Sequence, residues 1–520
     1  MDIANIAGIV RLHGQERPEQ VAIVYGEREL TWRELEDTSN QIANALLAAG
    51  VQANDRVARI DKNAPDYFQL AFAASKINAV LVDVNWRLAA PEMRQIVEDA
   101  GAKLLFVGTE FAPQLDKIEG ELASVQQTIL LGPADATHDG FDAWIAAHPT
   151  TDPGIDSTLD DVCLQLYTSG TTGLPKGVML SNRNLFSFIE EVPRNWDFTP
   201  ESVSHVVMPT FHIAGSGWGL VSLAMGSKMI LDREIDPSAI LREIEAHGIT
   251  HAIYVPAVLA FLQIVPNAHD HDLSTMQLVA YGASPITEQV LRDAMAQFAT
   301  AKFVQVYGLT ETTGAVVQLD AVDHDPENRP ELLRSAGKPY PWVELRTVGA
   351  GGKDVGVGEI GEIWIRGVQV MVGYWNNPTE TAKAITEDGW FRSGDAGYLT
   401  EDGYLFLHDR VKDMIVSGGE NVYPAEVENA VMGCPGVADV AVIGVPDEKW
   451  GEAVKAIVVK QADADVTPDQ VIAWSRERIA GFKVPKSVDF VDELPRNPSG
   501  KILKKDLRAP YWEGRERQIN

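Results

Sequence analysis

Short runs of β-branched and other apolar residues alternate with helical segments from about residue 20 to residue 340, and this alternation most limits how the chain can fold. The runs with the length of buried strands lie at residues 21–25, 56–60, 80–84, 104–107 and 128–131. Residues 31–49 have a helical pattern, with Thr31 at the N-cap, Glu34 three residues later and Gly50 after the end. The alternation predicts βαβ units with largely parallel strands, and its length predicts more than one packed sheet.

The pattern changes near residue 342, where turn-rich stretches begin to separate the strand-like segments. These segments lie at residues 343–348, 362–366 and 404–407 and are typical of an antiparallel or barrel-like piece. The strands and helices of a small α+β domain follow at residues 414–416, 424–432, 438–444 and 468–479. We therefore predict an α/β protein. Its large N-terminal domain of packed βαβ sheets, with the small β-barrel-like piece, spans residues 1–409, and a small α+β C-terminal domain spans residues 410–520.

Acidic residues outnumber basic ones by 74 to 44, which gives a formal net charge of −30. Such a field repels nucleic acid and anionic lipid, and we exclude both as main partners. Cys163 and Cys434 lie far apart and form no metal-ligand pair, which is typical of reduced thiols in the cytosol. The sequence has neither a signal-peptide pattern nor the ~18 consecutive apolar residues of a transmembrane helix. We expect a soluble, cytoplasmic protein without integral membrane association.

A glycine- and hydroxyl-rich loop follows the apolar run 162–166 and is the most informative segment. Its candidate anion-binding residues are Thr168, Ser169, Gly170, Thr171, Thr172, Gly173 and Lys176. Glycines let backbone N–H groups approach a phosphate, hydroxyl groups add donors, and the lysine supplies positive charge. The spacing excludes a P-loop, because Pro175 and Gly177 stand where that motif requires Gly and Ser or Thr. The segment therefore predicts a phosphate site of another kind.

Together with four later motifs, this loop resembles the signature of the adenylate-forming superfamily, which includes acyl-CoA synthetases, luciferases and the adenylation domains of peptide synthetases. The later motifs follow in the family's order at residues 307–311, 391–395, 409–413 and 495–501. The resemblance implies an acid–thiol ligase of the acyl-CoA synthetase branch. Such an enzyme converts a carboxylic acid and ATP to acyl-AMP and pyrophosphate, and then forms acyl-CoA and AMP. Its implied cofactors are ATP, Mg²⁺ and coenzyme A.

By this resemblance, the loop wraps the β- and γ-phosphates of ATP, and Thr168 and Glu311 hold Mg²⁺ through oxygen. Tyr307 stacks on adenine, and Thr310 bonds the α-phosphate. The other residues implied on the nucleotide side are Gly282, Ala283, Ser284, Gly308 and Leu309. Without the family context, a Thr-Glu pair would be typical of a helix N-cap.

The resemblance also implies that Asp395 and Arg410 bind the ribose hydroxyls and that Trp390 and Ser417 support the nucleotide. Lys501 is the implied catalytic lysine, which bridges the substrate carboxylate and the α-phosphate. Taken alone, such a lysine would be typical of an ordinary surface charge.

Family members rotate a small, mobile C-terminal domain between the two half-reactions. The hinge residue of this rotation maps onto Lys412, and Gly418 and Gly419 then line the pantetheine tunnel, where a Cβ would obstruct a linear chain. His212, with Phe211 before it, is the implied aromatic gate of the acyl pocket. A catalytic acid–base role for His212 is the less favoured alternative.

Small, uncharged residues follow this gate at positions 213–219 and suggest room for a substrate, with Trp218 able to cap or floor a pocket. Nothing in this run would bind a substrate amine, so the sequence favours an apolar acid and leaves fatty, aryl and polycyclic acids open. The oligomeric state also stays open, with a homodimer as one option.

Four alternative activities remain. Three share the adenylation step: a peptide-synthetase adenylation domain, a luciferase-type oxygenase, and a fatty acyl-AMP ligase or stand-alone enzyme that loads a carrier protein. The fourth, a non-catalytic nucleotide sensor, is disfavoured because Glu311 and Lys501 are both present.

Overall fold

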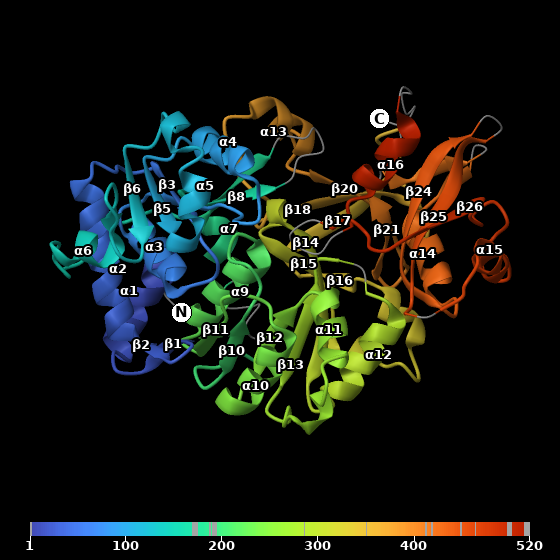
Figure 1. The fold of residues 1–520 in the computed structure, drawn as a ribbon, viewed down its shortest axis with the longest axis horizontal. Helices are drawn as coiled ribbons and strands as arrows, with labels where there is room; N and C mark the ends of the chain where they lie inside the picture. Colours follow the sequence, from blue (N-terminus) through green and yellow to red (C-terminus); the bar gives the residue numbers. More distant parts are fainter. Residues whose placement is uncertain are drawn as a thin grey trace. The chain divides into compact units, whose positions relative to one another are not determined.

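The structure is a computed structural model and describes residues 3–168, 175–186, 189, 195–284, 286–349, 351–410, 413–417, 420–447, 450–462, 464–496 and 502–513 (Figure 1). The chain forms two units. The first comprises Met1–Leu333, Pro339–Glu344 and Arg366–Phe391, and the second comprises Arg334–Lys338, Leu345–Ile365 and Arg392–Asn520. The boundary between residues 409 and 410 stays a prediction.

The first unit is built on two large sheets, which confirms the expected mixed α/β class. The nine-stranded sheet runs in the order β16 (Lys338–Pro339), β15 (Gly314–Leu319), β14 (Lys302–Leu309), β13 (Leu278–Gly282), β12 (His251–Tyr254), β10 (Val203–Val206), β11 (Lys228–Leu231), β1 (Val21–Tyr25) and β2 (Arg28–Thr31). The eight-stranded sheet runs in the order β19 (Gly373–Tyr374), β9 (Lys176–Ser181), β8 (Val162–Thr168), β4 (Val80–Asp83), β3 (Arg56–Ile60), β5 (Leu104–Gly108), β6 (Gln127–Leu131) and β7 (Asp139–Gly140). The central strands of both sheets pair in parallel, as the alternating pattern predicts.

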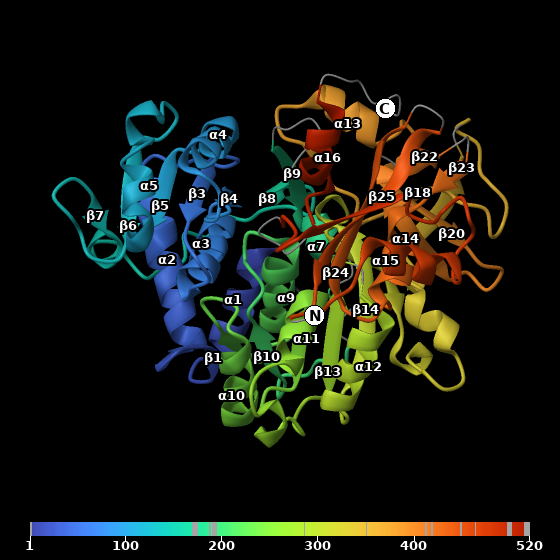
Figure 2. The same cartoon turned by 45° about the vertical axis from the view of Figure 1, so that its right-hand side comes forward.

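The helices of the first unit lie between strands in the sequence, except α1, which precedes β1 (Figure 2). They are α1 (Ile6–Glu16), α2 (Trp32–Ala48), α3 (Pro65–Lys76), α4 (Ala90–Ala100), α5 (Ala112–Leu115), α6 (Phe141–Ala146), α7 (Asn182–Phe186), α9 (Ile213–Ala224), α10 (Pro237–His247), α11 (Pro256–Gln263), α12 (Glu288–Gln297) and α13 (Pro378–Ala384). Short 3₁₀ turns are η1 (Thr109–Phe111), η2 (Glu119–Glu121), η3 (Ala268–Asp270), η4 (Thr310–Thr312), η5 (Ala321–Asp323) and η6 (Pro330–Arg334), the last of which ends at the border of the second unit.

The start of α2 shows how local sequence determines these helices. The hydroxyl of Thr31 accepts a hydrogen bond from the backbone N–H of Glu34 at 3.2 Å, and the Glu34 carboxylate accepts one from the N–H of Thr31 at 2.7 Å. This reciprocal pair satisfies two backbone donors that a helix start otherwise leaves free. The capped helix expected from Thr31 and Glu34 is confirmed.

Helices cover both faces of the nine-stranded sheet. Apolar residues of α10, α11 and α12 form one buried cluster with alternate residues of the strands, among them Ile230, Ala252 and Val279. Helix α9 lies on the other face, because a Cβ on its Gly219 would stand 3.3 Å from the Met229 side chain. Helix α9 therefore lies between this sheet and α3, whose Phe68 ring also contacts Gly219.

Two glycines of α9 serve close packing. A Cβ on Gly219 would lie 2.5 Å from the ring of Phe68, and one on Gly215 would lie 2.3 Å from the carbonyl oxygen of Met208. The small residues of the segment 213–219 are therefore not all explained by room for a substrate, since these two let α9 approach its neighbours.

The second unit contains most of a four-stranded sheet and a five-stranded sheet. The first of these has the order β17 (Val343–Val348), β18 (Gly361–Gly367), β20 (Phe391–Leu399) and β21 (Leu405–Arg410). The second consists of β23 (Glu420–Val422), β22 (Ile415–Ser417), β25 (Gly451–Lys460), β24 (Val437–Asp447) and β26 (Ser487–Val491), with helices α14 (Pro424–Met432), α15 (Pro468–Arg476) and α16 (Lys504–Trp512). Valines of β24, β25, α14 and α15 share one apolar core, as expected of a small α+β domain. In the part of the chain that the structure describes, no helix is long and apolar enough to cross a membrane.

Candidate active site

The two segments expected on the adenine side lie at the carboxyl ends of neighbouring parallel strands. Gly282 ends β13 and pairs with Val306 of β14, and the chain then enters Ala283 with a φ of +65°. A Cβ on Gly282 would stand 2.1 Å from the carbonyl oxygen of Val306, so only glycine allows this approach. The structure thus brings the segments 282–284 and 307–310 together at one sheet edge, where ligands of α/β sheets commonly bind.

The two ends of the predicted phosphate loop face each other in an antiparallel ladder. Thr168, the last residue of β8, pairs with Lys176, the first residue of β9. The loop residues Ser169, Gly170, Thr171, Thr172 and Gly173 lie outside the described residues. The ammonium group of Lys176 forms an ion pair with Glu380 of α13 and lies 5.0 Å from the centre of the Tyr374 ring.

Tyr374 connects this lysine to the predicted metal ligand. Its hydroxyl group donates a hydrogen bond to the Glu311 carboxylate at 3.0 Å, and the backbone carbonyl of Glu311 accepts another from the N–H of Met371 at 2.8 Å. We call Lys176, Glu311, Tyr374 and Glu380 the phosphate-end cluster. Glu380 accepts hydrogen bonds from Lys176 and Lys383. These two bonds, the one from Lys176 most of all, lower the pKa of Glu380 to about 2, so this carboxylate is ionised at neutral pH.

Two buried polar residues anchor the backbone before the predicted gate. The Asn63 amide donates to the carbonyl oxygen of Met208 at 3.1 Å and accepts from the backbone N–H of Thr210 at 3.0 Å. The Thr210 hydroxyl group donates to the Asp83 carboxylate at 2.7 Å. The gate residues therefore follow a segment that is hydrogen-bonded to the ends of β3 and β4.

His212 is a partly buried residue, and its Nε2 atom is fully buried without a hydrogen-bond partner among the described residues. Its ring centre lies 4.6 Å from that of Phe211, and the guanidinium of Arg87 lies 5.9 Å from the Phe211 ring. Burial, with a smaller contribution from Arg87, lowers the pKa of His212 to about 4. The imidazole is therefore neutral at pH 7, which suits an aromatic gate better than a cationic role.

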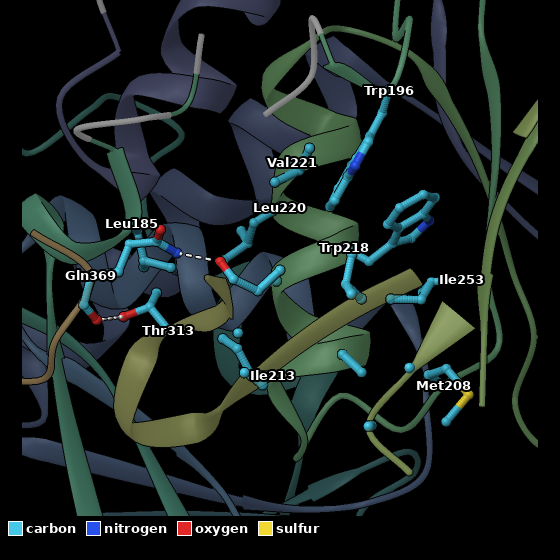
Figure 3. Close-up of a pocket in the computed structure, with 18 of the residues that line it drawn as sticks. Leu185, Trp196, Met208, Ile213, Trp218, Leu220, Val221, Ile253, Thr313 and Gln369 are labelled. Atoms are coloured by element: carbon cyan, nitrogen blue, oxygen red, sulfur yellow. Dashed lines mark hydrogen bonds between the residues drawn. The ribbon is translucent and has the colours of Figure 1, made fainter. Parts of the chain in front are cut away.

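An apolar pocket begins directly after this gate (Figure 3). It is lined by side chains and backbone of Leu185, Phe186, Ile189, Trp196, Met208, Ile213, Ala214, Gly217, Trp218, Leu220, Val221, Ile253, Tyr254, Val255, Gly282, Ala283, Val306, Gly308, Thr313, Gly314, Ala315 and Gln369. No charged side chain is among these lining residues. The pocket touches Gly282, Ala283 and Gly308, so it reaches the sheet edge at which the predicted nucleotide segments meet.

The other predicted residues are distributed over the second unit and its border. Asp395 and Arg410 stand opposite each other in the β20–β21 ladder, and Ser417 lies buried on β22. Trp390, at the end of the first unit, is buried beneath the guanidinium of Arg366, 4.5 Å from its ring centre. Lys412, Gly418, Gly419 and Lys501 lie outside the described residues. The individual roles of all these residues stay predictions.

Several residues of this site escaped sequence analysis. Tyr374 and Glu380 come from a segment with no assigned role, Asn63 follows an ordinary buried strand, and Asp83 ends another. No local sequence pattern marks these residues, and only tertiary contacts bring them to the site.

Comparison with known proteins identifies the family. Residues 10–375 match the family described as AMP-binding enzyme, and residues 426–501 match the AMP-binding enzyme C-terminal domain. The chain belongs to the AMP-binding enzymes. As a member, it is an ATP-dependent acid–thiol ligase that adenylates a carboxylic acid and then transfers the acyl group to a thiol.

Two similar proteins and one similar crystal structure illustrate the members of this AMP-binding family. The chain is 40% identical over 513 residues to the fatty acid–[acyl-carrier-protein] ligase ScoC of Streptomyces coeruleorubidus, covering 98% of this chain and 96% of ScoC. It is 39% identical over 496 residues to a feruloyl-CoA synthase of an Amycolatopsis species, covering 95% and 96%. The crystal structure of ATP-bound MatB from Rhodopseudomonas palustris superposes with a TM-score of 0.88 at 31% identity, covering 98% and 99%.

Proposed function

We propose that this AMP-binding enzyme joins an apolar carboxylic acid of medium length to coenzyme A. The observation that carries the proposal is the apolar pocket, which begins at the gate and reaches the sheet edge of the nucleotide segments. An acid in this pocket would direct its carboxylate toward that edge and its hydrocarbon part along α9. Burial of the hydrocarbon part favours binding by about 25 cal/mol for each Å² of apolar surface removed from water.

In the first half-reaction, a carboxylate oxygen attacks the α-phosphorus of ATP, the P–O bond to the β-phosphate breaks, and pyrophosphate leaves. Two anions must approach each other, so positive charge and hydrogen-bond donors must be held in place beforehand. We assign the β- and γ-phosphates to Lys176 and the loop that precedes it, the α-phosphate to Thr310, and adenine to Tyr307 with residues 282–284. Lys501 would bridge the two reacting anions.

The phosphate-end cluster fits Mg²⁺. The described residues contain no group of three or more His, Cys, Asp or Glu side chains that converge on a metal site. Mg²⁺ in nucleotide enzymes needs no such group, because one or two carboxylates and the substrate phosphates hold it. Glu311, with Thr168 at the end of β8, would supply the protein oxygens. The ion would neutralise charge on the phosphates.

The Lys176–Glu380 ion pair prepares the lysine for an anionic ligand. Glu380 forms an ion pair with Lys176, and a phosphate of ATP would compete for the same ammonium group. Lys383 also contacts Glu380, so the carboxylate keeps a cationic partner when Lys176 turns to the nucleotide. We propose that ATP binding exchanges one anion for another on Lys176.

In the second half-reaction, the thiol sulfur attacks the carbonyl carbon of acyl-AMP, and AMP leaves with one of the original carboxylate oxygens. The adenylate is already activated, so this step needs no strong base at the site. We propose that Lys412 is the hinge between the half-reactions, that Gly418 and Gly419 line the pantetheine path, and that Asp395 and Arg410 hold the ribose.

The pocket lining sets the size of the acid. On α9 the lining residues run from Ile213 to Val221 with helical spacing, which means that one helix face follows the pocket. Eight residues of α-helix rise roughly 12 Å. This length accommodates a medium-chain fatty acid or an aryl acid.

A second candidate function is transfer of the acyl group to a carrier protein. The observation that favours it is the similarity to ScoC, a fatty acid–[acyl-carrier-protein] ligase. Carrier proteins and CoA present the same pantetheine thiol, so the first half-reaction would be the same.

Mass spectrometry of the products tests both candidates. The protein would be incubated with ATP, Mg²⁺ and a panel of fatty, aryl and polycyclic acids, with either CoA or a pantetheinylated carrier protein as the acceptor. We expect acyl-CoA and an equal amount of AMP with a medium-length apolar acid. Acyl-carrier protein without acyl-CoA would support the second candidate, and acyl-AMP without any thioester would contradict both.

A further inference from the structure

Trp196 belongs to the lining of the acyl pocket, and hydrogen bonds hold both its backbone and its ring. Its backbone carbonyl accepts a hydrogen bond from Nε2 of the buried His251 at 3.0 Å. Its indole N–H donates to the amide oxygen of Gln318 at 2.7 Å. Both Trp196 and Gln318 are buried, so a turn of the indole would leave a donor and an acceptor without partners. The structure therefore fixes the ring of Trp196 in one place.

The Gln318 amide is itself fixed by three partners. Its oxygen accepts a second hydrogen bond, from the Tyr340 hydroxyl group at 2.9 Å, and its nitrogen donates to the Asp320 carboxylate at 2.7 Å. The amide therefore has one orientation, because a half-turn would point its NH₂ group at two other donors. Gln318 lies on β15 and is not one of the residues that line the pocket, so it acts on a bound acid only through Trp196.

Trp196 borders the part of the acid that lies beyond the first few carbon atoms. Its ring centre is 5.1 Å from that of Trp218 (Figure 3), and Trp218 comes five residues after Ile213, the first residue after the gate. The proposed function puts the carboxylate at the gate end of the pocket. Five residues of α-helix rise roughly 7.5 Å, which corresponds to about the seventh carbon of an extended chain.

We propose that Gln318 is a positioning residue for selection of the acid. It holds the Trp196 indole as a rigid wall, so that linear and flat hydrocarbon acids are accepted and isomers that are wider at this point are rejected. A wall that keeps its place discriminates by shape, because the wider group must either stay out or break the hydrogen bond that holds the ring. This inference rests on the proposed function and adds to it the shape of the acyl group.

Two pairs of acids with equal numbers of carbon atoms measure this selection. The first pair is decanoic acid and 7,7-dimethyloctanoic acid, which is wider at its seventh carbon. The second is 3-phenylpropanoic acid and 3-cyclohexylpropanoic acid, whose ring is thicker. The readout is the ratio of kcat/KM for the narrow acid to kcat/KM for the wide acid. In the unmodified enzyme we expect this ratio to be roughly 10 or more in at least one pair, as for a pocket that discriminates by about one methylene group.

Two changes remove the hydrogen bond between Trp196 and Gln318 from opposite sides. Gln318→Met keeps the length of the side chain and removes its amide. Replacement of Trp196 by 3-benzothienylalanine keeps the bicyclic ring, exchanges N–H for sulfur and leaves Gln318 intact, so it gives the same test if Gln318→Met fails to fold. We expect the ratio to fall by about fivefold in both proteins, equivalent to one neutral hydrogen bond, because the wide acid becomes a better substrate.

Tyr340→Phe is the matched control. It removes the other hydrogen bond to the same amide oxygen and leaves the one from Trp196 in place. We expect the ratio to stay near that of the unmodified enzyme. A ratio of two kcat/KM values does not depend on the fraction of active protein, so a variant that is only less stable would not change it.

Three outcomes would overturn the inference. One is an unmodified enzyme that turns over the two acids of each pair equally or prefers the wider one. Another is a ratio that survives the exchange of the indole N–H for sulfur, whatever Gln318→Met shows. The third is an equal fall of the ratio in Tyr340→Phe. Failure of the unmodified enzyme to activate any of the four acids would instead contradict the proposed function together with this inference.

Discussion

The phosphate-end cluster and the acyl pocket lie in the same unit and differ in how their polar groups are partnered. In the cluster, every charged group is engaged: Lys176 with Glu380, and Glu311 with Tyr374. In the pocket the lining is apolar, and Trp218 has the one unpaired indole N–H among the described lining residues. The charged groups at the phosphate end are thus paired with one another, whereas the pocket offers an acid mainly apolar surface.

The comparison also separates the two kinds of selectivity. An ammonium group that already has a carboxylate partner discriminates by charge and binds any triphosphate of suitable shape. An apolar pocket discriminates by the size and shape of the acid. Changes at the phosphate end should therefore affect all acids alike, and changes in the pocket should affect acids unequally.

The largest expected effect is at Glu311. Glu311→Gln keeps the shape and removes the charge that would hold Mg²⁺, and we expect kcat for acyl-AMP formation to fall by about 100- to 1,000-fold, the range for loss of one transition-state stabilising group. Tyr374→Phe is the matched control, because it removes only the hydrogen bond to Glu311. Its loss should stay below about tenfold, as for one hydrogen bond. ATP–pyrophosphate exchange measures both. An equal effect of the two variants would contradict the assignment of Glu311.

Lys176→Met should act mainly on ATP. Loss of a charge-assisted hydrogen bond, worth about 1.5–3 kcal/mol, should raise the KM for ATP by about 10- to 100-fold for every acid tested. Glu380→Gln tests the opposite change. It removes the charge of the carboxylate that would compete with ATP for the Lys176 ammonium group, so the KM for ATP should stay equal or become lower. Initial-rate kinetics with two acids check both variants. A KM for ATP that rises in Glu380→Gln would show that the ion pair supports the nucleotide site and does not compete with it.

Gly217→Leu should affect acids unequally. Gly217 lines the pocket, and a Cβ there would stand 3.3 Å from the side chain of Ile213, which lines it too. The added side chain fills space along α9, and we expect kcat/KM to fall about tenfold for long acids, equivalent to roughly one or two lost methylene contacts, and to change little for short ones. A competition assay with acids of graded length measures this. An equal fall in kcat/KM for acids of every length would mean that the substitution disturbs the folding of α9 and does not act through the space in the pocket.

The last expected effect concerns pH and is absent at neutral pH. The pKa of His212 is about 4 in the folded protein and 6.5 ordinarily, so the unfolded chain binds the proton first as pH falls. This residue therefore destabilises the folded state progressively between pH 6.5 and about 4, by at most about 3 kcal/mol, and has no such effect above pH 6.5. Thermal melting of the protein and of His212→Gln across this range measures the difference. Identical pH dependence of the two melting temperatures would contradict the burial of a neutral imidazole.

The features set by local sequence were predictable. The capping box of α2 follows from neighbouring residues, and the parallel central strands of both sheets follow from the alternation of strand and helix patterns. The contacts of Lys176 with Glu380 and of Tyr374 with Glu311 join residues 204 and 63 positions apart in the chain. No periodicity or motif of a single sequence encodes such pairs, because they depend on how separate elements pack.

The glycines of α9 show the same limit in a single helix. Sequence analysis interpreted the small residues at 213–219 as room for a substrate, but Gly215 and Gly219 accommodate the Met208 carbonyl and the Phe68 ring, and Gly217 alone of the three lines the pocket. Which face of a helix meets a ligand is decided by its neighbours, and those neighbours come from distant strands and helices.

The most direct test of the account follows the oxygen atoms of the acid. The proposed mechanism requires a carboxylate oxygen to attack the α-phosphorus and to leave with AMP. A turnover experiment with the preferred acid, labelled with oxygen-18 in both carboxylate positions, followed by mass spectrometry of AMP, pyrophosphate and thioester, would trace these atoms. We expect one heavy oxygen in AMP, one in the thioester carbonyl and none in pyrophosphate. Unlabelled AMP, or label in pyrophosphate or phosphate, would contradict the adenylation mechanism.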